Sequence, residues 1–165
     1  SLRNYLKALD DFLSQSLPRL SDDPLSSEKY GLENAKRLAA LVFHEALCEY
    51  GQDLKHEQQL GEALADIFTE IYTMESVIAR VSQIQSANGA SNMSSIIARI
   101  YAAESLLKMK SLSKVCLNKI FKEIIPDNHL ETIQQLTSRM ALHIDVISLK
   151  QELADFMYTK KDYPF

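Results

Sequence analysis

The chain has 165 residues, of which 46% are hydrophobic and 24% charged, with only 4 glycines and 4 prolines. This length fits one domain with its own core, and the shortage of turn residues argues against a β protein with many short strands. The net charge of −4 provides no basic surface of the kind that binds polyanions, so we expect no nucleic-acid partner.

The two cysteines, Cys48 and Cys116, lie far apart in apolar stretches. This pattern indicates small buried hydrophobic residues in a reducing compartment rather than a disulfide framework. The sequence shows no signal peptide and no apolar run approaching about 18 residues, the length of a membrane span. We therefore expect a cytoplasmic protein.

The first part of the chain is expected to form a short amphipathic helix and a linker. The helix, residues 1–17, places its leucines on one side and must end before Pro18; these leucines are Leu2, Leu6, Leu9 and Leu13. The linker, residues 18–27, is polar and contains two prolines and three serines. The remaining residues, 28–165, are predicted to form one helical bundle domain.

A second helix is predicted over residues 28–50, with Gly51 as its stop. Asp53 is expected to cap the next helix, which has Glu57 in its first turn. The buried side of the second helix is predicted to comprise Leu32, Ala35, Leu38, Ala39, Val42, Phe43, Ala46 and Tyr50.

The third helix, which ends near residue 86, has the clearest apolar period in the chain. Seven large side chains alternate at spacings of four and three, which places them on one stripe: Leu60, Leu64, Ile67, Ile71, Met74, Ile78 and Val81. Five more residues widen the apolar arc, so we expect this helix to be covered on more than one side: Ala63, Ala65, Phe68, Tyr72 and Val77.

Three further helices follow a turn at Asn88-Gly89. The fourth is predicted to bury Ile96, Ile100, Ala103, Leu107, Leu112, Cys116 and Ile120 before a stop at Pro126. The fifth is expected to open with a capping box, Asn128 with Glu131, and to bury Ile133, Leu136, Met140 and Ile144. Asp145 starts a short last helix with Leu149, Leu153 and Phe156. The predicted fold is all-α: an antiparallel helical bundle of about four long helices plus short terminal helices.

Few side chains have a spacing that could support chemistry. His44 and Cys48 lie one helical turn apart, like the two ligands of a zinc protease helix, but no third ligand follows at a familiar spacing. We therefore expect Phe43 and Leu47 to pack and His44 to lie near the rim. Lysines gather on the fourth helix and beyond, and we interpret them as a solvated face rather than a contact to phosphate: Lys108, Lys110, Lys114, Lys119 and Lys122.

Three carboxylates on or near apolar helical faces, Glu45, Glu70 and Glu104, raise the possibility of a di-iron bundle site. Such a site needs paired Glu-x-x-His motifs, and the nearest run is Asp53-Leu54-Lys55-His56 at a helix start. We therefore expect these carboxylates either to lie at the edge of the apolar side of their helices or to pair with a neighbouring basic side chain. A buried carboxylate needs such a partner.

The amino-acid sequence of the third helix resembles the acyl-CoA dehydrogenase family, in particular the extra C-terminal helical region of its very-long-chain branch and bacterial relatives. The resemblance lies in Leu64-Ala65-Asp66, Ile71-Tyr72-Thr73-Met74-Glu75-Ser76 and Arg80. Two more runs are similar to neighbouring helices of the bacterial relatives: Leu32-Glu33-Asn34-Ala35-Lys36-Arg37-Leu38 and Ile147-Ser148-Leu149-Lys150-Gln151-Glu152-Leu153-Ala154-Asp155. The resemblance covers residues 28–165.

The resemblance implies an oxidoreductase that uses FAD and a glutamate base to remove the α-proton and β-hydride of an acyl-CoA in fatty-acid metabolism. It also implies that upstream catalytic domains build the flavin and acyl pockets. The Tyr-Glu-Gly-Thr type motif that carries the base in this branch is absent, since Tyr30-Gly31 lacks the intervening Glu. We therefore expect no catalytic, cofactor-binding or metal residue here, and expect FAD and acyl-CoA to be bound by the parent chain.

The start at Ser1-Leu2 without Met indicates either processing or a fragment of something larger. Together with the missing catalytic motif, the resemblance implies a non-catalytic C-terminal piece that supports the catalytic body or the subunit contacts of a homo-oligomer. The alternative is an independent helical interaction or adaptor module, and a weaker one is a metalloprotein built on His44 and Cys48. For residues 1–17 we favour intramolecular docking over membrane contact, because the bases Arg3 and Lys7 are matched by Asp10 and Asp11.

Overall fold

The computed structural model describes residues 11, 22–88 and 92–160, and within these ranges the protein is helical without strands. Five α-helices and one 3-10 helix follow one another: α2 (Ser26–Tyr50), η1 (Gly51–His56), α3 (Gln58–Asn88), α4 (Asn92–Ile120), α5 (Asp127–Arg139) and α6 (Val146–Lys160). The predicted all-α bundle is confirmed. The predicted N-terminal helix, apart from Asp11, the residues after Asn88 in the turn, and the tail after Lys160 lie outside the described residues.

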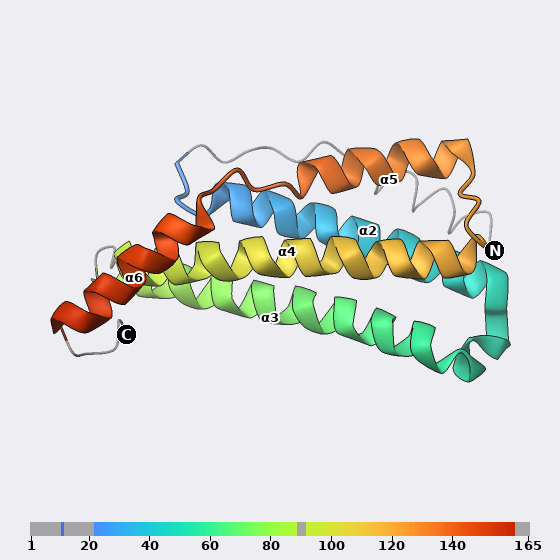
Figure 1. Cartoon of the computed structure of the whole chain (residues 1–165), viewed down its shortest axis with the longest axis horizontal. Helices are drawn as coiled ribbons and strands as arrows, with labels where there is room; N and C mark the ends of the chain where they lie inside the picture. Colours follow the sequence, from blue (N-terminus) through green and yellow to red (C-terminus); the bar gives the residue numbers. More distant parts are fainter. Residues whose placement is uncertain (1–10, 12–21, 89–91, 161–165) are drawn as a thin grey trace.

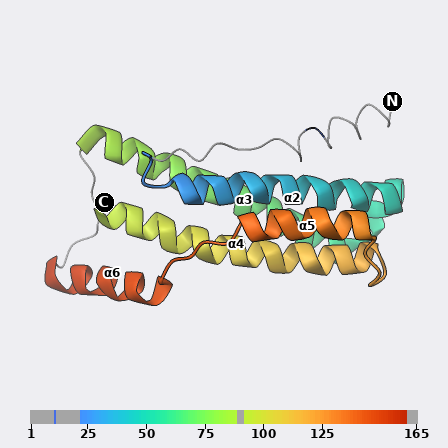
Figure 2. The same ribbon diagram turned by 90° about the horizontal axis from the view of Figure 1, so that it is seen from above.

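The helices run up and down along one long axis. Figure 1 shows α2, α3 and α4 side by side, with α3 running opposite to the other two and α5 returning along α2. Helix α6 lies at one end of the bundle beside the first half of α4, as the view from above shows (Figure 2). Short connections between antiparallel neighbours are typical of helical bundles.

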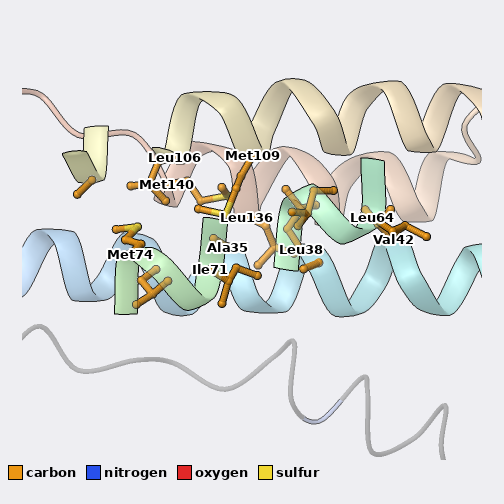
Figure 3. Close-up of a cluster of buried hydrophobic side chains, with 14 of the residues drawn as sticks. Ala35, Leu38, Val42, Leu64, Ile71, Met74, Leu106, Met109, Leu136 and Met140 are labelled. Carbon is orange, nitrogen blue, oxygen red and sulfur yellow. The ribbon is translucent and has the colours of Figure 1, made fainter. Parts of the chain in front are cut away.

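The core lies between α2, α3, α4 and α5, which all contribute large apolar side chains (Figure 3). Ile71 of α3 lies beside Leu38 of α2, while Leu106 of α4 lies beside Met140, which follows α5. All seven residues of the predicted α3 stripe are buried. The helical period therefore identified the inward side of α3 correctly, because burial of one apolar stripe stabilises most helices in proteins.

The predicted wide cover of α3 is wrong in part. Ala63 and Val77 are half-buried against the core, but Ala65, Phe68 and Tyr72 are exposed, Tyr72 by 73% of its surface. Helix α3 contacts α2, α4 and η1, and these neighbours all lie on the stripe side. In the described residues, nothing else covers its outer flank.

The predicted inward side of α4 is confirmed toward both ends of the helix and wrong in its middle. Ile96, Ile100, Cys116 and Ile120 are buried, but Leu107 is 70% exposed and Ala103 half-buried, whereas Leu106 and Met109 are buried in their place. In this middle part Gly31 of α2 makes room for Leu106. A Cβ atom on Gly31 would lie 2.8 Å from Cδ1 of Leu106, so even an alanine would displace that side chain.

The observed helix ends agree in part with those predicted from the sequence. Gly51, with φ of 52°, terminates α2 as predicted, and Asp145 accepts a hydrogen bond from the backbone N–H of Ser148 (3.0 Å) at the start of α6. Asp53 does not cap α3, since η1 intervenes and α3 begins at Gln58. The capping box is also wrong, because α5 begins at Asp127 with Pro126 at its N-cap position and without a side-chain cap.

The cysteine prediction is confirmed for Cys116, which is buried, and wrong for Cys48, which is exposed. Burial raises the pKa of the Cys116 thiol to about 11. Only the thiolate reacts with alkylating reagents. We expect iodoacetamide to label Cys48 alone in the native chain and both thiols in denaturant, as mass spectrometry of the intact protein will show. Rapid native labelling of Cys116 would contradict its placement.

No helix in the described ranges is long and apolar enough to cross a membrane.

Candidate interaction surface

The His44–Cys48 pair lies on the side of α2 that α5 covers. His44 is only 3% exposed, and its Nε2 is 3.4 Å from Sγ of Cys48. The neighbouring Glu45 lies 3.1 Å from Nε2 of His129 on α5. The prediction for this turn is thus reversed: His44 is buried, whereas Phe43 and Leu47 are exposed, because α5 packs on the histidine side. Among the described residues, no three His, Cys, Asp or Glu side chains form a group that could hold a metal ion.

Each of the three candidate carboxylates has a partner on another helix. Glu45 contacts His129 as above, and the exposed Glu104 of α4 forms an ion pair with Lys150 of α6. Glu70 of α3 accepts hydrogen bonds from Ser105, from Nζ of Lys108 (2.7 Å) and from the Tyr101 hydroxyl (3.3 Å). These carboxylates therefore join helices, as the pairing interpretation predicted.

The Glu70 cluster connects α3 to α4 and should make stability depend on pH. Partial burial would raise the pKa of the Glu70 carboxyl, but the hydrogen bonds from Lys108, Ser105 and Tyr101 outweigh it, so its pKa lies below the ordinary 4.5. A carboxyl with a lowered pKa stabilises the folded state fully above the ordinary value. This contribution is lost as the pH falls from 4.5 through the lowered pKa.

We expect Glu70→Gln to lower the free energy of unfolding at pH 7 by about 1.5–3 kcal/mol, the range for hydrogen bonds to a charged group. The gap between the parent chain and the variant should narrow below pH 4.5. Urea unfolding at several pH values measures both effects. Glu62→Gln, on the exposed side of α3, is the control and should change little. An equal loss in both variants would contradict the role of the cluster.

The lysines of the predicted solvated face are mostly exposed, and three of them form ion pairs. Lys108 contacts Glu70, Lys119 lies 3.2 Å from Glu57, and Lys122 lies 3.5 Å from Glu49. Exposed pairs of this kind contribute little to stability. Acidic neighbours thus compensate part of this charge, which supports the interpretation as a solvated face.

An ion pair between a buried carboxylate of α2 and an arginine of α4 was not predicted from the sequence. Glu28 is 2% exposed, and its Oε1 lies 3.3 Å from Nε of Arg99. Only the packing of the two helices brings these distant residues together. One signal was available, because Glu28 precedes Leu32 and Ala35 at spacings of four and seven and so shares their inward side.

Two surfaces expose large apolar side chains. The first, which we call the aromatic face, is formed by Phe43 and Leu47 of α2 with Phe68 and Tyr72 of α3. The rings of Phe43 and Phe68 meet edge to face with centroids 5.8 Å apart. Such an arrangement is favourable for aromatic pairs, and contiguous exposed apolar groups mark interaction sites.

The second surface, the α4–α6 face, is formed by Leu107 of α4 with Ile147, Met157 and Tyr158 of α6. Ile147 is 72% exposed, and a cleft of about 400 Å³ lies between Leu107 of α4, the connection from α5 to α6 and Val146 at the start of α6. None of the described side chains of α6 is buried, although four are half-buried: Val146, Leu149, Leu153 and Phe156. Because helices in proteins draw their stability from packing, such a helix is typical of a surface that binds another protein body.

The fold and these surfaces define a helical domain suited to contacts with other protein surfaces. Residues 34–123 match the family model described as acyl-CoA dehydrogenase, C-terminal domain. The chain therefore belongs to this family, which confirms the resemblance found in the sequence. Of the residues that carry that resemblance, Leu64, Ile71 and Met74 are buried, while Glu75 forms an ion pair with Lys36 of α2 (2.7 Å).

Two similar proteins place the match within a longer polypeptide. A probable acyl-CoA dehydrogenase of Bacillus subtilis (strain 168) is 26% identical over 141 residues, which make up 84% of this chain and 23% of that protein. The crystal structure of an acyl-CoA dehydrogenase complexed with FAD from Bacillus anthracis has a similar fold, with a TM-score of 0.84 at 23% identity over 97% of this chain and 27% of that one. The chain thus spans about a quarter of the length of these relatives.

Proposed function

We propose that this chain is the non-catalytic accessory domain of an FAD-dependent acyl-CoA dehydrogenase that acts in fatty-acid β-oxidation. In this proposal the α4–α6 face docks on the catalytic body of the same polypeptide. The observation that carries it is α6, a helix of 15 residues whose described side chains are at most half-buried. The relatives are about four times as long as the matched region, so a parent of that kind has a large body to cover this helix.

The described residues do not fit FAD. A dinucleotide pyrophosphate is bound by a glycine-rich loop and free backbone amides at a helix N-terminus. Clefts of the described residues lie between α4 and the α5–α6 connection (about 400 Å³), between α3 and α4 (about 310 Å³) and beside the start of α2 (about 320 Å³). None of these three is lined by a glycine. The proposal therefore assigns FAD and acyl-CoA to the rest of the parent chain, and we expect the isolated chain to be colourless and to bind no FAD.

The proposal also includes a cytoplasmic, homo-oligomeric parent enzyme. The unpaired thiols Cys48 and Cys116 support a reducing compartment. The oligomer is an inference from the family resemblance, in which the accessory domain supports subunit contacts as well as the catalytic body.

Hydrogen exchange measured in two samples tests the docking: the isolated chain and the full parent enzyme. We expect the amides of α6 to exchange much more slowly in the parent, because docking suppresses local opening. Ile147→Asp in the parent should restore the fast exchange of the isolated chain. Ile124→Asp, at an equally exposed apolar residue outside this face, is the matched control and should leave the protection unchanged.

Equal exchange of α6 in both samples would refute the docking. Translation of the gene upstream of Ser1 tests the wider assignment, since the absence of a flavin-binding body there would favour an independent helical interaction module.

A further inference from the structure

We propose that the catalytic body of the parent chain places an acidic residue against Lys110 and an apolar side chain in the cleft beside it. This cleft is the one bordered by Leu107, by the connection from α5 to α6 and by Val146, and we call it the Lys110 cleft. The inference rests on the proposed docking of the α4–α6 face, and it names the chemistry of the surface that docks there.

Lys110 is a half-buried cation whose counter-ion is missing from the described part of the chain. Three lysines are half-buried among those whose burial the structure describes: Lys29, Lys36 and Lys110. Lys29 forms an ion pair with Asp23, and Lys36 forms one with Glu75. No described carboxylate forms such a pair with Lys110, so a partner from outside these residues can supply it.

The missing counter-ion has an energetic consequence. Burial lowers the pKa of the Lys110 ammonium, and no charged neighbour among the described residues opposes this effect. Withdrawing an ammonium group from water costs free energy unless an anion or another acceptor replaces the lost water. Lys110 therefore destabilises the isolated domain, whereas a carboxylate on a docked surface would turn the same group into a stabilising contact.

The surroundings of Lys110 are mainly apolar. The Lys110 cleft, of about 400 Å³, is lined by aliphatic side chains that include Leu106, Leu107 and Met140. Glu104 also lines it, but its carboxylate pairs with Lys150 of α6 and not with Lys110. An apolar cleft beside an ammonium group is complementary to an apolar side chain next to a carboxylate. Buried anchors of this kind supply most of the binding energy of protein interfaces.

A second cleft, of about 320 Å³, borders the other side of the α5–α6 connection and supports the acidic character of the partner. The two clefts share Ala141 and Leu142. Three basic side chains line the second one: Arg99, Arg139 and His143. Its carboxylate, Glu28, is already paired with Arg99. Although the chain has a net charge of −4, basic groups thus flank this connection, and an acidic surface complements them.

The parent polypeptide is the favoured source of this surface. The relatives are about four times as long as the matched region, so a body of the same polypeptide can meet the cleft at a high effective concentration. Helix α6, which borders the cleft at Val146, has no buried side chain among those described. One docked body would cover both features.

Lys110→Met tests the inference because we expect opposite effects in two samples. Methionine keeps an unbranched side chain and removes the charge. In the isolated chain we expect the midpoint of urea unfolding to rise, because a half-buried charge without a partner is lost. In the full parent enzyme we expect the amides of α6 to exchange about ten-fold faster or more, which corresponds to the loss of a hydrogen bond to a charged group.

Two further variants control for other effects of the substitution. Lys110→Arg keeps the charge and should preserve most of the protection of α6 in the parent. Lys114→Met removes an exposed lysine one turn further along α4 and should change neither the urea midpoint nor the exchange.

Unchanged or slower exchange of α6 in the Lys110→Met parent would overturn the inference, since the docked surface would then need no cation. The docking itself would still stand if α6 of the unaltered parent exchanged more slowly than α6 of the isolated chain. Equal exchange in those two unaltered samples would refute the docking and the inference together.

The isolated chain gives two more contrary outcomes. A lower urea midpoint for Lys110→Met would show that Lys110 finds its carboxylate within this chain. A midpoint shift that depends on protein concentration would indicate a second copy as the partner. Either result would overturn the assignment of the acidic residue to the catalytic body.

Discussion

Replacing Ile71 with aspartate is expected to destabilise the isolated chain strongly. Ile71 lies in the middle of the buried α3 stripe, opposite α2. The substitution removes the packing of a large aliphatic side chain and places a carboxylate without a partner in the core. Together these effects should cost about 4 kcal/mol or more, a large part of the 5–15 kcal/mol that stabilises a typical domain.

Circular dichroism and urea unfolding measure this loss, and Ala79→Asp is the matched control. Ala79 lies on the exposed side of the same helix, so the same new charge should cost only a few tenths of a kcal/mol there. A variant at position 71 that melts like the parent chain would show that the stripe faces solvent.

Truncating Leu106 to alanine is expected to cost about 2–5 kcal/mol, whereas the same change at Leu107 should cost less than about 0.5 kcal/mol. Leu106 is 1% exposed and packs against Gly31 of α2 and against Met140. Its loss leaves a cavity at the closest approach of α2 and α4. Leu107 already lies mostly in water on the α4–α6 face.

The two alanine variants share a helix, a chemistry and adjacent positions, so their difference reports only the rotation of α4. Urea unfolding of the isolated chain gives both values. A larger loss of unfolding free energy for Leu107→Ala than for Leu106→Ala would contradict the observed orientation of α4. Gly31→Ala provides a further check, because it should destabilise the parent chain by displacing Leu106 but should stabilise the Leu106→Ala variant through better helix propensity.

The sequence predicted α3 well for a physical reason. Seven of its large apolar residues, from Leu60 to Val81, follow one regular spacing, so a single rotation of the helix buries all seven. The glycine stop at Gly51 was equally clear, because its backbone adopts a conformation with positive φ that other residues rarely adopt.

Helices α2 and α4 were harder to orient because their apolar residues occur on several sides. In α4 the adjacent Leu106 and Leu107 offer two rotations, and the observed one buries the small residues Ala98 and Ala102 where α2 approaches. Periodicity weighs a large exposed leucine above a small buried alanine, so the predicted side wrongly included Leu107, although Ile96, Ile100, Cys116 and Ile120 of the same prediction are buried. For α2 the burial of His44 rather than Phe43 depends on α5, a helix far away in sequence.

The candidate surfaces could not be derived from the sequence, because the type of an apolar residue does not show whether another helix covers it in the fold. The helical period implied that Phe68 and Tyr72 need a cover, and the described residues of the bundle do not provide it. The α4–α6 face emerged only from the position of α6 at the end of the bundle.

The path of the chain through the bundle bears on how the domain folds. Helices α2, α3 and α4 follow one another and pack as sequence neighbours, so their contacts form over short loops, which favours rapid folding. Helix α5 instead packs on α2, from which α3 and α4 separate it in the sequence. The contact between α5 and α2 therefore closes a long stretch of sequence, which is slower than closing a short connection. We expect α5 to dock last during refolding and to detach first under mild denaturant.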